Sequence, residues 1–185
     1  MSSGPVSSLT RRHELDYKSY WEGHYRAGGD SGAGSYGDHA QYKADILNRL
    51  VRDRGIKTVL EFGCGDGNHL AYYEFGEYLG LDVAASAVSK CTQKYSDDAT
   101  EAFRTIKPDE GLDLGTFDLV ISIEVLMHVI DEDAFLWTLD NIFSHASRYV
   151  AILTPLTNLI DKPAATTRST GTSSPISIPI SASSQ

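Results

Sequence analysis

The sequence predicts an α/β fold with a doubly wound parallel sheet. Short apolar segments have the length and composition of strands buried on both faces, and they span residues 58–62, 77–83, 117–123 and 148–153. Segments with helical spacing of apolar residues alternate with these strands, which favours parallel strands joined by crossover helices. Carboxylates lie at the ends of three of the strands, at the sheet edge where such folds bind ligands. We therefore expect one domain with a ligand site at that edge.

The first 37 residues combine aromatic side chains with a glycine-rich stretch. Tyr17, Tyr20, Trp21 and Tyr25 are crowded into a polar segment, and a run rich in glycine and serine follows over residues 27–37. Such a segment suits a lid that closes over a ligand and excludes water. A disordered leader whose aromatic side chains cover one end of the sheet is an equal alternative.

A helix is expected next, from about Asp38 to Arg54. Its apolar residues Ile46, Leu47, Leu50 and Val51 are expected to pack against the sheet. Lys43 lies near the start of this helix, where it is available to a carboxylate of a ligand, although such a lysine is more often solvated.

The first strand, Thr58–Phe62, leads into glycines at alternate positions, Gly63, Gly65 and Gly67, and Glu61 precedes them. A glycine loop brings backbone N–H groups close to a ligand because no Cβ intervenes. A dinucleotide fingerprint requires a further glycine where this chain has Asn68, so that pattern fails. A tight turn that binds no ligand is the alternative.

A second carboxylate, Asp82, closes the apolar segment 77–83. It lies about twenty residues beyond Glu61, the interval at which a βαβ unit places an acid on a ribose. The alternative is that Asp82 caps the helix that starts near Ala84; both roles are compatible. The helix expected over Ser86–Tyr95 then serves as the crossover.

Glu124 and His128 are the candidate catalytic residues. Glu124 follows the nearly continuous apolar segment Phe117–Ile123, and His128 comes four residues later. If a helix begins at Glu124, the two side chains share a face toward the ligand edge. A neutral imidazole there can take a proton from a hydroxyl or an amine. A histidine bonded to the backbone at a strand–helix junction is the alternative. A helix over 134–143 and a fifth strand over 148–153 follow.

In order and spacing, segments 58–67, 77–83 and 117–129 resemble the motifs of class I S-adenosylmethionine-dependent methyltransferases, which have a Rossmann-like sheet. The resemblance covers about residues 17–158. Within the class, the segment Gly34–Gly37 and the Glu124–His128 spacing make the chain similar to a set of small bacterial-type members. It implies that Gly63, Gly65 and Gly67 pass beneath the methionine part of S-adenosylmethionine and that Glu61 holds the loop and the amino group. It implies ribose binding for Asp82.

The resemblance also sets the expected boundaries. Residues 1–37 are the lid or leader, residues 38–160 the methyltransferase domain, and residues 161–185 a tail. The tail is rich in serine and threonine and lacks aromatic residues, so we expect it to be disordered. Class I methyltransferases normally continue past the fifth strand with a helix and a final antiparallel pair of strands. We therefore expect a C-terminally truncated domain that lacks the last two strands.

Composition excludes several functions. A formal net charge of −9 makes nucleic acid an unfavourable partner. The two cysteines, Cys64 and Cys91, cannot build a disulfide framework, and the six scattered histidines show no metal-ligand spacing. No segment is long and apolar enough for a membrane, so we expect a cytoplasmic protein with no membrane or metal partner. The oligomeric state is not predicted.

The sequence thus predicts an S-adenosylmethionine-dependent methyltransferase with a small-molecule acceptor. The alternative is a non-catalytic remnant that binds S-adenosylmethionine without transferring its methyl group. A nicotinamide oxidoreductase is disfavoured because Asn68 replaces the third glycine of the dinucleotide fingerprint. A nucleophilic role for Cys64 is also disfavoured, because the loop needs a small residue at that position for packing.

Overall fold

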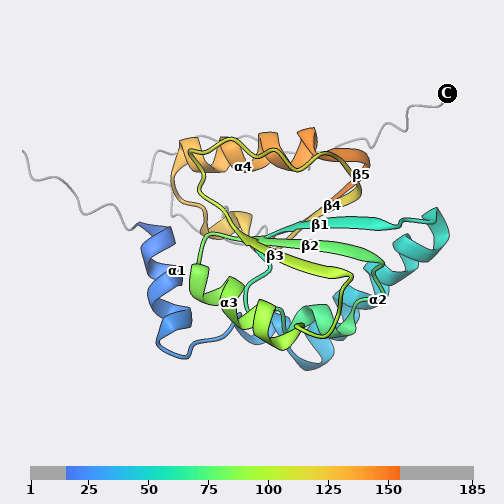
Figure 1. Cartoon of the computed structure of the whole chain (residues 1–185), viewed down its shortest axis with the longest axis horizontal. Coiled ribbons are helices and arrows are strands. Elements are labelled where there is room, and N and C mark those ends of the chain that lie inside the picture. The colour runs from blue at the N-terminus through green and yellow to red at the C-terminus, as the bar shows by residue number, and fades with distance from the viewer. Residues whose placement is uncertain (1–15, 155–185) are drawn as a thin grey trace, which may run out of the picture. The chain divides into compact units, whose positions relative to one another are not determined.

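A computed structural model describes residues 16–154 of the chain. The predicted tail, residues 161–185, and the first fifteen residues of the predicted leader lie outside the described residues. Five strands form one sheet in the order β3-β2-β1-β4-β5, and all four pairings are parallel (Figure 1). The strands are β1 (Thr58–Phe62), β2 (Glu77–Asp82), β3 (Glu101–Thr105), β4 (Phe117–Ile123) and β5 (Ala146–Leu153). The prediction of a parallel α/β sheet is confirmed.

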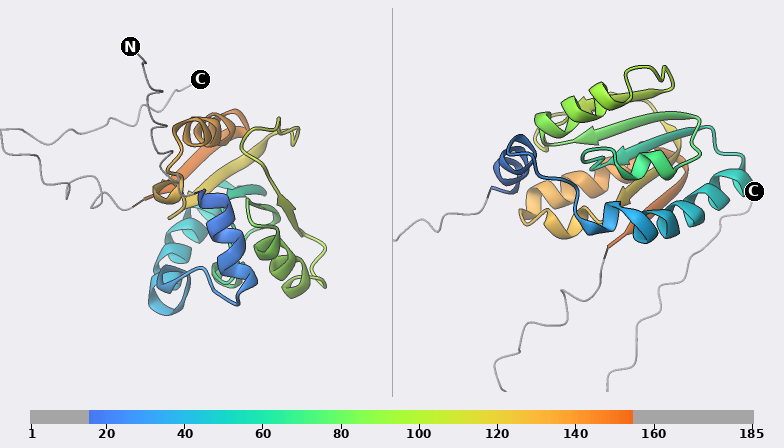
Figure 2. Two further views of the ribbon diagram at one scale, coloured as in Figure 1. Left: turned by 90° about the vertical axis from the view of Figure 1, so that its left-hand side faces the viewer. Right: turned by 90° about the horizontal axis from the view of Figure 1, so that it is seen from below.

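Helices cover both faces of this sheet, as a doubly wound fold requires. The α-helices are α1 (Tyr17–Arg26), α2 (Gly37–Arg54), α3 (Ala85–Lys94) and α4 (Glu132–Ser144), and the 3-10 turns are η1 (Ala33–Ser35), η2 (His69–Tyr72) and η3 (Leu126–His128). α2 and α3 lie on one face and α4 on the other (Figure 1). α1 packs against α3 near the ends of the strands (Figure 2).

The sheet separates two hydrophobic cores because successive side chains of a strand point to opposite faces. In β1, Val59 packs with residues of α2, whereas Leu60 and Phe62 pack on the face covered by α4. In β4, Ile121 lies on the α2 face and Val120 on the α4 face. All five residues are at most 1% exposed. Burial on both faces explains why these strands are almost continuously apolar.

β3 is a strand that the sequence pattern did not predict. It pairs with β2 along its whole length and forms one edge of the described sheet. Its side chains are exposed or only half-buried, and Glu101 and Arg104 are among them. An edge strand with charged side chains lacks the apolar signal of the central strands.

Two expectations about helices are corrected. Ile46, expected to pack against the sheet, is 51% exposed on α2, whereas Leu47 and Val51 are buried as expected. The helix expected to start at Glu124 is only the 3-10 turn η3, and α4 begins later, at Glu132. The carboxylate of Asp131 caps α4 by accepting a hydrogen bond from the backbone N–H of Ala134 at 2.8 Å.

None of the helices within residues 16–154 combines the length and the apolar composition needed to cross a membrane. The same residues contain no cluster of three or more His, Cys, Asp or Glu side chains arranged to hold a metal ion.

The buried position of Ile121 gives a test of the core. Ile121→Ala should lower the free energy of unfolding by about 2–5 kcal/mol, because the lost methyl and methylene groups leave a cavity. Urea denaturation followed by circular dichroism measures this change. Ile46→Ala, at an exposed position of α2, is the matched control and should change the free energy of unfolding by less than about 0.5 kcal/mol. Equal losses in the two variants would contradict the assigned core.

Candidate active site

A cavity lies at the carboxyl ends of β1, β2 and β4, the edge predicted for the ligand site. Its wall is drawn from four parts of the chain: the N-terminal segment, the loop after β1, the end of β2 and the segment after β4. These parts contribute Tyr17, Trp21, Tyr25, Ser31 and Ser35; Gly63, Gly65 and His69; Asp82 and Val83; and Glu124, Val125, His128 and Val129. Phe62, Ile106, Pro108, Ile123, Trp137 and Thr138 complete it. Most of the predicted site residues therefore meet at one cavity.

The three loop glycines all have positive φ, and two of them line the cavity. At Gly65, where φ is 57°, an added Cβ would collide with Oγ of Ser31 and lie 2.9 Å from the hydroxyl oxygen of Tyr25. At Gly67 an added Cβ would lie 2.9 Å from Sγ of Cys91. Gly67 thus packs against α3, away from the cavity, while Gly63 and Gly65 face it.

Asp82 joins the glycine loop to the start of α3. Its Oδ2 accepts a hydrogen bond from the backbone N–H of Gly65 and its Oδ1 accepts one from that of Ala84, both at 2.9 Å. The residue is 8% exposed and faces the cavity. Burial raises the pKa of the carboxyl to about 6, although the two backbone donors oppose the shift. The contact with Ala84 agrees with the helix-start alternative and leaves ribose binding as a prediction.

Glu61 is completely buried and lies behind the loop. Its carboxylate accepts a hydrogen bond of 2.5 Å from the hydroxyl of Tyr78, and both oxygens lie 3.1 Å from Nε2 of His69. The carboxylate does not line the cavity, whereas His69 does. Direct contact between Glu61 and a cofactor stays a prediction, and the structure gives this acid partners within the protein.

His69 is a cavity residue that sequence reasoning missed. It follows the glycine loop directly and begins η2, which turns the chain back toward the end of β1. A histidine eight residues after Glu61 was a signal that could have identified the pair, because the loop between them is a tight turn.

Glu124 and His128 both line the cavity, but not through a shared helix face. Glu124 directly follows β4 and has a φ of 60°, an uncommon conformation for a residue other than glycine. Its carboxylate pairs with Nζ of Lys43 at 2.6 Å, so Lys43 does meet a carboxylate, one of the protein's own. Side chains of Lys43 and Glu124 are 10% and 34% exposed.

His128 lies in η3 with its ring edge-to-face against Trp21, at 5.1 Å between ring centroids. Burial lowers the pKa of His128, and the nearby charge of Glu124 only partly opposes this effect. The neutral imidazole is therefore the favoured form at neutral pH, as a proton acceptor requires.

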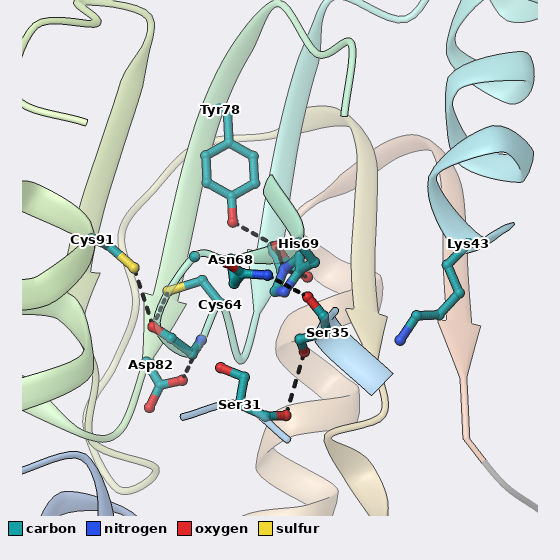
Figure 3. Close-up of polar contacts among 12 residues, drawn as sticks. Ser31, Ser35, Lys43, Cys64, Asn68, His69, Tyr78, Asp82 and Cys91 are labelled. Atoms are coloured by element: carbon teal, nitrogen blue, oxygen red, sulfur yellow. Dashed lines mark hydrogen bonds and ion pairs between the residues drawn. The ribbon is translucent and has the colours of Figure 1, made fainter. Parts of the chain in front are cut away.

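The N-terminal segment is tied to the glycine loop by hydrogen bonds. The carboxylate of Asp66 accepts bonds from the backbone N–H of Ser31 at 3.2 Å, from its hydroxyl at 2.8 Å and from the hydroxyl of Tyr36 at 3.1 Å. Nδ2 of Asn68 donates to the carbonyl oxygen of Ser35 at 2.6 Å (Figure 3). Partial burial would raise the pKa of Asp66, but its donors outweigh burial and lower it. Residues 31–36 are thus anchored over the cavity.

This anchoring gives a test that needs no ligand. Asp66→Ala should raise the amide hydrogen-exchange rates of residues 31–36 about tenfold or more, since several bonds to a charged acceptor are lost. Mass spectrometry of peptic peptides measures those rates. Asp53→Ala on the exposed surface of α2 is the control and should leave them unchanged. Unaltered exchange in Asp66→Ala would show that other contacts hold the segment.

Comparisons with known proteins agree with this geometry. The family described as "Methyltransferase domain" matches residues 60–148. No protein of curated function matches the sequence. Among solved structures, the chain is similar to the N-methyltransferase NodS from Bradyrhizobium japonicum WM9, in complex with S-adenosyl-L-homocysteine, with 18% identity, a TM-score of 0.60, and 71% of this chain and 68% of that chain covered.

Two further structures are similar. Magnesium protoporphyrin IX methyltransferase (ChlM) from Synechocystis PCC 6803 with bound SAM has 19% identity, a TM-score of 0.55 and coverage of 77% of each chain. CalS10, an amino pentose methyltransferase from Micromonospora echinaspora, has 19% identity, a TM-score of 0.50 and coverage of 77% of this chain and 55% of that chain. Because these identities are low, the structural likeness shows a shared fold and nothing further. The chain thus matches the methyltransferase-domain family over residues 60–148 and shares the fold of solved S-adenosylmethionine-dependent methyltransferases, the class whose motifs its sequence resembles.

Proposed function

We propose that this chain binds S-adenosylmethionine and transfers its methyl group to a small-molecule acceptor. The observation that carries the proposal is a single cavity that unites Gly63, Gly65 and Asp82 with Glu124 and His128. The first three suit a cofactor, and the last two suit an acceptor that must lose a proton. The NodS, ChlM and CalS10 structures were each obtained with S-adenosylmethionine or S-adenosylhomocysteine bound, which supports the cofactor assignment.

The residues of the cavity fit S-adenosylmethionine chemically. Val83, Ile106 and Pro108 provide an apolar surface that suits an adenine ring. Asp82 has one backbone donor on each carboxylate oxygen, and each oxygen keeps a lone pair for a ribose hydroxyl. The backbone at Gly65 has no Cβ that would separate it from a ligand. Bound at this site, the cofactor would supply an electrophilic sulfonium methyl group.

The protein's own contribution to the reaction would be proton transfer and alignment. His128, neutral and facing the cavity, would accept the proton that a hydroxyl or amine acceptor loses as its oxygen or nitrogen bonds to the methyl carbon. Glu124, held by Lys43, would orient the acceptor by accepting a hydrogen bond from it. Trp21 restricts the imidazole by its edge-to-face contact. Alignment of this kind contributes several kcal/mol to a bimolecular reaction, on the order of 7–11 in favourable cases.

The N-terminal cover supports a small acceptor. Tyr17, Trp21 and Tyr25 of α1 and the anchored residues 31–36 close over the cavity and limit its access to water. We infer that residues 16–37 act as a lid. The net charge of −9 argues against a nucleic-acid acceptor.

The alternative is a protein that binds the cofactor without methyl transfer. The match covers 68% of the NodS chain, 77% of the ChlM chain and 55% of the CalS10 chain, so methyl transfer by this chain is a proposal that needs its own test. Titration calorimetry with S-adenosylhomocysteine and NAD tests the cofactor, and a screen for methyl transfer to small alcohols, acids and amines tests the reaction. Binding of NAD in place of S-adenosylhomocysteine would contradict the proposal.

Asp82 gives a pH-dependent prediction. Ribose hydroxyls donate more strongly to a charged carboxylate, so affinity for S-adenosylhomocysteine should reach its full value only well above the Asp82 pKa of about 6. As pH falls below about 6, Asp82 becomes protonated and affinity should decline by at most about tenfold per pH unit. Asp82→Asn should bind at least about tenfold more weakly and lose this dependence. Asp53→Asn, at an exposed position of α2, is the control and should keep the wild-type affinity and pH dependence. An unchanged affinity in Asp82→Asn would contradict ribose binding by Asp82.

His128 gives a kinetic prediction that requires an acceptor from the screen. As the proton acceptor, His128→Gln should lower turnover about a hundredfold or more, with affinity for S-adenosylhomocysteine changed by less than about twofold. The wild-type rate should fall as pH drops through the lowered pKa of His128. A modest loss of activity that follows a lower melting temperature would instead identify a structural junction residue.

A further inference from the structure

Behind the glycine loop, three side chains from different elements form a buried hydrogen-bonded group. Glu61 of β1 has no exposed surface, and it accepts hydrogen bonds from the hydroxyl of Tyr78 on β2 and from Nε2 of His69 on η2 (Figure 3). A buried carboxylate is costly unless it is paired and hydrogen-bonded, and here both conditions are met. The group fixes the position of the His69 ring.

The second ring nitrogen of His69 is available to a ligand. Nε2 is occupied by Glu61, and Nδ1 forms no hydrogen bond with any residue between 16 and 154. The side chain is only 8% exposed, yet the residue lines the cavity. This nitrogen has no hydrogen-bond partner among residues 16–154, and a ligand in the cavity that His69 lines can supply one.

The surroundings favour the doubly protonated imidazole. Burial alone would lower the pKa of His69, and so does the ammonium of Lys43. The carboxylate of Glu61, by charge and hydrogen bond, and more distantly that of Asp66 outweigh them, so the pKa of His69 is raised. With Nε2 donating to Glu61, a protonated ring presents Nδ1–H as a charge-assisted donor.

Polar side chains lie near His69. Ser31 and Ser35 line the same cavity, and the ammonium of Lys43 is close enough to act on the pKa of His69. The ion pair of Lys43 with Glu124 adds one charge of each sign. Apolar residues such as Ile106 and Pro108 form another part of the wall. A ligand with an aromatic base at one end and a zwitterionic amino-acid group at the other matches this separation.

We propose that His69, held by Glu61 and Tyr78, binds the carboxylate of the cofactor's amino-acid group through Nδ1–H. This assignment rests on the proposed function, since it takes S-adenosylmethionine or S-adenosylhomocysteine as the ligand. Glu61 and Tyr78 are then positioning residues that act through His69 and do not touch the ligand.

The test compares two ligands that differ only in the carboxylate, S-adenosylhomocysteine and its decarboxylated analogue. Titration calorimetry of the wild-type protein should show that S-adenosylhomocysteine binds at least about tenfold more tightly, the value of one charge-assisted hydrogen bond. His69→Gln retains a donor for Glu61 but loses Nδ1–H. In this variant the preference should shrink to about twofold or less, through loss of affinity for S-adenosylhomocysteine alone. His39→Gln, on the exposed surface of α2, is the matched control and should keep the wild-type preference.

A measurement on the wild-type protein covers the case in which His69→Gln does not fold. The preference for S-adenosylhomocysteine should fall as pH rises through the raised pKa of His69, because Nδ1–H is then lost. Protonation of Asp82 at low pH acts on the shared ribose of both ligands and cancels in the ratio.

Four results would overturn the assignment. Equal losses for both ligands in His69→Gln would mean that His69 only supports the loop. A loss in His69→Gln that appears with the decarboxylated analogue, which keeps the ammonium group, and not with the deaminated analogue, which keeps the carboxylate, would assign His69 to the ammonium group. Failure of the wild-type protein to bind S-adenosylhomocysteine would overturn the proposed function and this assignment together, whereas binding without any preference would overturn this assignment alone.

Discussion

The conformation at Gly65 is the constraint on which the site depends. Its backbone N–H donates to Asp82 at the end of β2, and its carbonyl oxygen accepts from Sγ of Cys91 on α3 at 3.1 Å. The remaining side is covered by Ser31 and Tyr25, which leave no room for a Cβ. One residue with positive φ therefore links the central sheet, the crossover helix and the N-terminal cover. A shift at this residue would move all three contacts at once.

Two buried acids hold this loop in different ways. Glu61 is hydrogen-bonded by side chains, the hydroxyl of Tyr78 and the ring of His69, and lies in the protein interior. Asp82 is held by backbone donors at Gly65 and Ala84 and faces the cavity. Backbone dipoles do not fully offset burial, which is why the pKa of Asp82 is raised to about 6. The first acid is thus committed to the fold, and the second keeps acceptor capacity for a ligand.

Local sequence patterns predicted the central strands and the glycine loop. The continuous apolar strands β1 and β4 and the glycine loop follow from strand burial and from the spacing of Gly63, Gly65 and Gly67. Edge strand β3 was missed because its exposed charged residues dilute that signal. The contact of Ser31 with Asp66 and the pairing of Lys43 with Glu124 could not be predicted, since each joins residues more than 30 positions apart. His69 was missed because a single histidine carries no periodic pattern, although its partner Glu61 was identified.

Hydrogen bonds join the N-terminal cover to α3 and to the glycine loop. α1 is anchored on α3, where the hydroxyl of Ser86 donates to the carboxylate of Glu22 at 3.1 Å, and residues 31–36 are anchored on the glycine loop through Asp66. A ligand that touches the backbone at Gly65 must occupy space beside Ser31 and Tyr25, the side chains that already lie against it. Because Ser31 also bonds Asp66, one residue beyond Gly65, displacement of the cover is transmitted directly to the loop. If residues 16–37 act as the proposed lid, Ser31 would couple opening of the cover to cofactor binding, and a substitution in the cover would change the affinity for the cofactor.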